Sequence, residues 1–128
     1  MSYYYKKTIS GIFDETIEKV KTLLQKEGFG VLTEINIKDT FKKKLNVDFK
    51  SYKILGACNP QFAYKALQAE DKIGVMLPCN FIIQEIQTNT IEIAVINPLV
   101  SMQAVKNKEL ESIAVDISKK LNNVINSL

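Results

Sequence analysis

The sequence predicts an α+β fold, with one mostly antiparallel sheet of four to five strands and long helices packed on one face of it. Alternating apolar segments and amphipathic segments follow one another in the order β-α-β-(α)-β-α-β-β-α. Residues 79–97 form an uninterrupted hairpin pattern, which favours antiparallel pairing. A chain of 128 residues without a repeat or linker is the size of one domain, so we expect a single domain over residues 1–128.

The first half of the chain predicts three strands and two helices. The strands follow from β-favouring or alternating apolar residues at 3–9, 29–37 and 51–59. A helix is expected over residues 13–27, where apolar residues recur every three or four positions and Gly28 follows as a natural stop. A weaker pattern over residues 38–45 predicts a short helix with Asp39 as its cap.

The second half predicts two helices around the hairpin. Asn59-Pro60 is a helix start, because the Asn side chain accepts from free amides and proline fits the first turn, so residues 60–69 should be helical. The following apolar run "IGVML" is compatible with a strand or a buried helix. Residues 107–127 form the strongest amphipathic pattern of the chain and predict the closing helix.

The hairpin places two asparagines at one end of the sheet. It turns near residues 87–90, and if Gln87 faces Thr90, paired positions sum to about 177 by simple counting. Asn80 then lies opposite Asn97 on the adjoining strand. We therefore expect the motifs Pro78-Cys79-Asn80 and Asn97-Pro98 to meet at this end of the sheet.

Whether Cys58-Asn59 joins them depends on the connection between the third strand and the hairpin. A single helix joining parallel strands would leave Cys58 and Cys79 at opposite ends. A helix that runs down the sheet, followed by "IGVML" running back up, would start the hairpin beside Cys58. We favour the second route, which predicts that Cys58 and Cys79 lie on neighbouring strands near the helix that Asn59-Pro60 opens.

Composition excludes several classes of function. The chain has no histidine, which removes Ser-His and Cys-His nucleophile pairs and histidine-ligated zinc. The net charge of +3 does not call for nucleic acid. No segment approaches a membrane span or a signal peptide, so we expect a cytoplasmic protein with reduced thiols. No cofactor or metal is predicted.

Three segments resemble a known family: "EGFGVLTEINI", "YKILGACNPQFAYKAL" and "IGVMLPCNFII". Together they are similar to the uncharacterised family called domain of unknown function 302, over nearly the whole chain. The resemblance implies a compact α+β domain and no established activity. It gives weight to the positions of the two motifs and of Pro98. Members of that family usually carry Asp at the position of Asn36, so any chemistry of that acid would be lost here.

The candidate ligand-binding residues are Cys58, Asn59, Cys79, Asn80 and Asn97. Four of these five residues also have a purely structural explanation. The cysteines are compatible with small buried apolar groups, Asn59 with a helix cap and Asn97 with a turn initiator. Asn80 has no such explanation, because asparagine is depleted inside strands.

The leading hypothesis is a module that binds a small polar or anionic ligand at this end of the sheet. One alternative is a thiol-dependent enzyme with Cys58 or Cys79 as its nucleophile. The other is a structural or regulatory interaction domain. Tyr3, Tyr4 and Tyr5 on an expected edge strand also predict a homodimer.

Overall fold

The computed structural model describes all 128 residues and contains one five-stranded sheet. Its strands lie in the order β1-β5-β4-β3-β2, and every neighbouring pair is antiparallel. The strands are β1 (Tyr4–Ser10), β2 (Gly30–Asn36), β3 (Tyr52–Cys58), β4 (Cys79–Gln87) and β5 (Thr90–Ile96). The predicted α+β class is confirmed, and β1 is an edge strand as expected.

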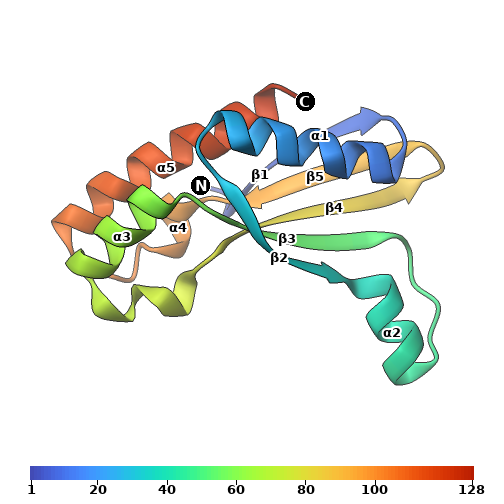
Figure 1. The fold of residues 1–128 in the computed structure, drawn as a ribbon, viewed down its shortest axis with the longest axis horizontal. Helices are drawn as coiled ribbons and strands as arrows, with labels where there is room; N and C mark the ends of the chain where they lie inside the picture. The colour runs from blue at the N-terminus through green and yellow to red at the C-terminus, as the bar shows by residue number, and fades with distance from the viewer.

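The two long helices, α1 (Phe13–Lys26) and α5 (Lys108–Asn126), cover one face of this sheet (Figure 1). Strand residues that point toward them alternate with residues that point away, as the pleat requires. Side chains fully buried between helices and sheet include Leu24, Phe81, Ile93 and Leu121. None of the helices is both long and apolar enough to span a bilayer.

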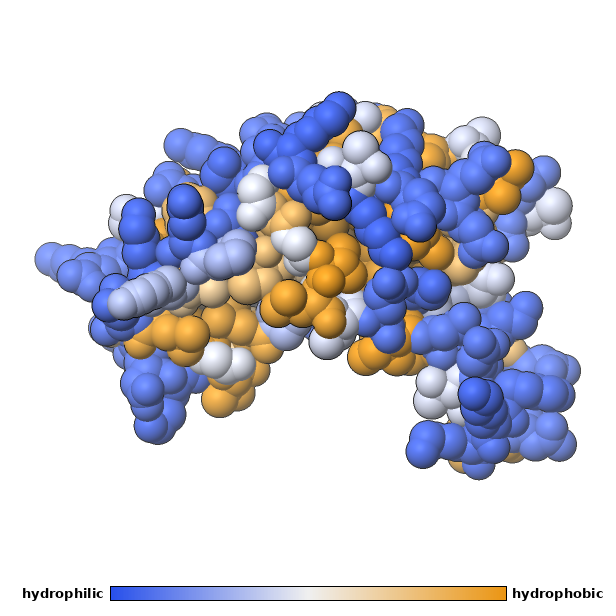
Figure 2. Space-filling model, in the orientation of Figure 1, coloured by the Kyte–Doolittle hydropathy of each residue, from blue (hydrophilic) through white to orange (hydrophobic).

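The remaining helices lie at the two ends of the sheet. α3 (Pro60–Ala69), the 3-10 helix η1 (Asp71–Met76) and α4 (Pro98–Ser101) gather at one end, while α2 (Ile37–Leu45) projects from the other (Figure 1). The sheet face opposite α1 and α5 carries no helix. Apolar atoms collect along this underside, and the surface is hollowed between it and the lobe formed by α2 (Figure 2).

The expected route from β3 to β4 is partly wrong. Cys58 and Cys79 do lie on neighbouring strands at the same end, because Ala57 pairs with Cys79. However, "IGVML" does not run back along the sheet. Most of it belongs to η1, which packs beside α3 beyond the end of the strands. Ile73 is buried against Ala66 and Met102 there, so its burial is satisfied by helices and not by the sheet.

The expected pairing of Asn80 with Asn97 is off by one residue. Gln87 pairs with Thr90 as predicted, but the register shifts between Glu85 and Gln87. Beyond this bulge the paired residues run from Glu85↔Ile91 to Phe81↔Val95. A β-bulge adds one residue to one strand and moves every later pair by one. Continued by one step, the ladder places Asn80 beside Ile96.

The structure also corrects the expected cap of α2 and adds one short helix. The N-cap of α2 is Asn36, whose side chain accepts from the backbone N–H of Asp39 at 3.0 Å. Asp39 is therefore a first-turn residue and not the cap. Because Asp and Asn cap helices about equally well, Asn36 keeps the cap that an Asp would supply. The short helix α4, which follows Asn97, was not expected.

We predict that Gly56→Ala destabilises the fold by about 1–3 kcal/mol, the usual cost of overpacking. A Cβ at Gly56 would lie 2.7 Å from the Cγ of Pro78 and still closer to the Oγ1 of Thr33. Gly30→Ala is the matched control, because a Cβ there meets nothing within 4 Å. Urea unfolding should show a lower midpoint for Gly56→Ala only, and equal midpoints would contradict the close approach of β2, β3 and Pro78.

Candidate functional site

The five predicted site residues all lie at one end of the sheet, but the structure distributes them over its two faces. Cys58 and Asn59 end β3 and cap α3, Cys79 and Asn80 open β4, and Asn97 follows β5. Cys79 is buried on the helix side, whereas Asn80, the next residue, is exposed on the open face. The set therefore does not form one cluster.

Asn97 is a structural residue of the helix side. Its side chain is only 1% exposed, accepts from the backbone N–H of Leu99 at 3.1 Å and donates to the carbonyl of Ser2 at 3.3 Å. The hydroxyl of Ser118 on α5 also donates to it, at 3.3 Å. Because its amide group is engaged by the protein itself, Asn97 has no obvious capacity for a ligand.

Asn59 is likewise occupied by the fold. Its side-chain oxygen accepts from the backbone N–H of Phe62 at 3.5 Å, which caps α3 as predicted. Its Nδ2 donates to the carbonyl of Glu27 at 3.4 Å, just past the end of α1. Asn59 thus connects α3 with the end of α1, and it satisfies the helix terminus that an anion would otherwise use.

The two free cysteines have the properties of protonated thiols. Burial raises the pKa of Cys79 to about 11, with a smaller contribution from nearby Cys58, and burial also raises the pKa of Cys58. Both line a cavity of about 210 Å³ between α3, α5 and the end of the sheet, and 12 of its 14 lining residues are hydrophobic. This environment stabilises neutral thiols and not the thiolate that a nucleophile needs.

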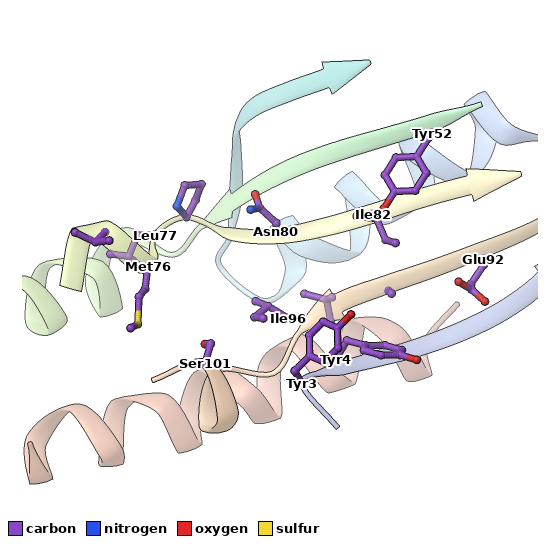
Figure 3. Close-up of a pocket in the computed structure, with 14 residues that line it drawn as sticks. Tyr3, Tyr4, Tyr52, Met76, Leu77, Asn80, Ile82, Glu92, Ile96 and Ser101 are labelled. Carbon is purple, nitrogen blue, oxygen red and sulfur yellow. The ribbon is translucent and has the colours of Figure 1, made fainter. Parts of the chain in front are cut away.

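The open face of the sheet holds a larger cavity, of about 600 Å³ (Figure 3). Ile82, Ala94 and Ile96 lie along the strands in this cavity, and Asn80 is at its end near Leu77 and Met76 of the η1 segment. Its other polar side chains are Ser101, Glu92 and three tyrosines: Tyr3, Tyr4 and Tyr52. Of these two cavities, this one combines an apolar surface with several accessible polar groups.

Tyr52 and Glu92 were not predicted from the sequence. They belong to one rung of the sheet, where Tyr52 pairs with Gln84 and Gln84 pairs with Glu92. Finding them requires the positions of three strands and the bulge in β4, since only these fix which residues share the open face. No group of three or more His, Cys, Asp or Glu side chains is placed to hold a metal ion.

A protein family and a crystal structure are similar to this chain over nearly its whole length. A family model described as "Domain of unknown function DUF302" matches residues 5–128. The crystal structure of an uncharacterised conserved DUF302 protein from Bacillus stearothermophilus is similar, with a TM-score of 0.90 and 30% sequence identity over 98% of each chain. None of the curated proteins matches.

We predict that both thiols are slow to alkylate in the folded protein near neutral pH. The raised pKa values leave little thiolate, so iodoacetamide should react roughly 10-fold or more slowly than with free cysteine, with half-buried Cys58 ahead of buried Cys79. Mass spectrometry of Cys58→Ser and Cys79→Ser assigns each rate, and unfolding should make both thiols reactive.

The pH dependence of stability tests whether the pKa of Cys79 is raised. The pKa of the Cys79 thiol is higher in the folded state than in the unfolded state. The protonated thiol therefore contributes to stability below the unfolded-state pKa, and this contribution is lost as the pH rises toward about 11. Cys79→Ala should therefore reduce the loss of stability in that alkaline range. Alkylation of either thiol as fast as a free thiol would contradict the buried-thiol interpretation.

Proposed function

Because this chain belongs to the DUF302 family, a domain of unknown function, we propose its role from the site itself: it binds a small polar ligand on the open face of the sheet, where Pro78-Cys79-Asn80 opens β4. The ligand lies on the open face, in the cavity of about 600 Å³. That volume is in the range typical of small-molecule sites.

Asn80 is the single observation that carries this proposal. It is exposed at the end of a cavity in which 10 of 14 lining residues, the three tyrosines among them, are hydrophobic, and no hydrogen bond within the protein holds its side chain. A carboxamide offers both donors and an acceptor to a ligand. An apolar surface with a few convergent polar groups is the usual composition of a ligand site.

The lining favours a neutral or cationic ligand over an anionic one. Neither cavity is lined by a lysine or an arginine, and Glu92 is the one charged residue of the larger cavity. The N-terminus of α3, where free backbone amides could bind an anion, is capped by Asn59. We therefore retain the polar ligand of the original hypothesis and set aside the anionic one.

Thiol-based catalysis receives less support. Cys58 and Cys79 line the smaller, almost entirely apolar cavity, and their pKa values are raised and not lowered. The chain offers no histidine to serve as a base for either thiol.

We predict that Asn80→Ala abolishes or strongly weakens stabilisation by a ligand identified in a thermal-shift screen of small polar compounds. A ligand present at about 100 times its Kd stabilises the folded state by about 2.7 kcal/mol, which is readily measured. Asn123→Ala, at an exposed position on α5, is the control. If compounds stabilise wild type and Asn80→Ala equally, the ligand does not use this site.

A second proposal concerns self-association, which we assign to the α2 lobe and not to the three tyrosines. Tyr5 faces the helices, where its hydroxyl lies beside that of Ser118, so the tyrosines do not share one surface. In contrast, α2 has no buried residue, and Leu45, Val47 and Phe49 at its end are exposed. A helix of nine residues gains little stability alone, so contact with a second copy would stabilise it.

We predict that the protein is a homodimer in solution and that Leu45→Ser weakens the dimer. Leu45 is 65% exposed, and Leu32→Ser is a matched control because Leu32 is 67% exposed but lies outside the α2 lobe. Light scattering over a concentration series should show dissociation at higher concentration for Leu45→Ser than for the control. A monomer mass for wild type at high concentration would rule out the dimer.

A further inference from the structure

The polar groups of the open-face cavity are not evenly spread along it. Asn80 and Ser101 lie toward the η1 end, whereas Glu92 lies toward the other end (Figure 3). Asn80 and Gln84, which pairs with Glu92, are four residues apart on β4, which corresponds to about 13 Å along a strand. The cavity therefore has two separate polar ends with an apolar surface between them.

The Glu92 end offers acceptors and a negative charge. The Oε1 of Glu92 accepts from the Nε2 of Gln84 at 3.0 Å. The Oε1 of Gln84 has no hydrogen-bond partner, but it is buried beneath the cavity lining, since Gln84 is only 9% exposed. Gln84 itself does not line the cavity, so the acceptor open to a ligand at this end is the carboxylate of Glu92, and the complementary group on a ligand is a donor or a cation.

The charge of Glu92 is only loosely compensated. Its Oε2 lies 3.7 Å from the Nζ of Lys6, whose side chain is 55% exposed. Exposed ion pairs at such a distance contribute little, because water screens them. Lys6 does not line the cavity, and neither does any other lysine. Outside the lining, the Nζ of Lys50 lies 6.0 Å from the centroid of the Tyr52 ring. Among the residues that line the cavity, Glu92 is the only charged one.

Three aromatic rings line the same cavity. Tyr3 and Tyr4 stand edge to face, with centroids 4.9 Å apart and an interplanar angle of 72°. Tyr52 comes from β3, which lies three strand spacings, or about 14 Å, from β1 across β5 and β4. The side chains extend over the sheet toward one another, and the pKa of Tyr52 is raised by burial and, to a smaller extent, by Tyr3 and Glu92. Tyrosine rings and a carboxylate are the composition that recognises ammonium groups.

We propose that the ligand of this cavity is a small organic cation, an ammonium group with apolar substituents, whose charge lies among Tyr3, Tyr52 and Glu92. The inference rests on the proposed small-ligand function and adds the chemical class of the ligand. The alkyl substituents contact Ile82 and the ring faces, and a polar group at the other end of the ligand reaches Asn80. An anion finds no cationic side chain in this cavity.

The test uses three probes of similar shape and different charge: choline, its neutral isostere 3,3-dimethylbutan-1-ol, and the anion pivalate. Titrations of the ¹⁵N-labelled full chain, followed by NMR, give each Kd and the residues whose amides shift. Choline should bind roughly 10-fold more tightly than the isostere, as cation–π contacts and a carboxylate predict, and pivalate should not bind. The shifts should include Tyr52, Ile82 and Glu92.

Two variants locate the charge recognition. Glu92→Gln keeps an acceptor for Gln84 but removes the charge, so it should erase most of the preference for choline over the isostere. Tyr3→Leu changes a residue that is 64% exposed, so the fold is preserved while choline affinity falls several-fold. Glu111→Gln, on the exposed side of α5, is the control and should change neither Kd.

The outcomes separate this inference from the proposed function. Equal affinity for choline and the isostere, or an unchanged preference in Glu92→Gln, overturns the cationic ligand and leaves the small-ligand site standing. The same holds if none of the three probes binds while other compounds stabilise wild type but not Asn80→Ala. If no compound distinguishes wild type from Asn80→Ala, the site itself is wrong.

Discussion

The constraint on which the rest of the structure depends is that α1 and α5 cover only one face of the sheet. An antiparallel sheet tolerates this, because alternate residues of each strand then separate into a buried set and an outward set. On β4 the buried set includes Cys79, Phe81 and Ile83, and the outward set includes Asn80 and Ile82. The same alternation that builds the core therefore also composes the open-face cavity, and neither can change without the other.

Most of the asparagines at the ends of this sheet serve as N-caps of helices. Asn36, Asn59, Asn97 and Asn107 each accept a hydrogen bond from a backbone N–H in the first turn of α2, α3, α4 and α5. Such caps satisfy amides that would otherwise be buried without partners. Asn80 is different, because it lies inside a strand and caps nothing. Asn80 therefore has no capping role, and its side chain lies on the cavity wall.

The sequence predicts the elements of this fold better than their relative placement. Helical periodicity and the Asn59-Pro60 start give α3 and α5 nearly to the residue, since those patterns are local. The bulge in β4 has no sequence mark, because residues 79–87 alternate well enough to suit either register. The burial of Ile73 depends on Ala66 of the preceding helix and on Met102, which lies far away in sequence. The cavity is harder still, because Tyr52 and Glu92 meet only through Gln84 on the strand between them.

The repeated dipeptide Cys-Asn shows why motif identity is a weaker guide than backbone position. In Cys58-Asn59 the chain leaves β3 for α3, so the asparagine turns inward as a cap and reaches the carbonyl of Glu27. In Cys79-Asn80 the chain enters β4, so the pleat buries the thiol and sends the carboxamide outward. One pair of residues thus supplies a structural asparagine at one place and a free one at the other. The functional distinction arises from the direction in which the backbone continues, and only Asn80 is left with a side chain that a ligand can use.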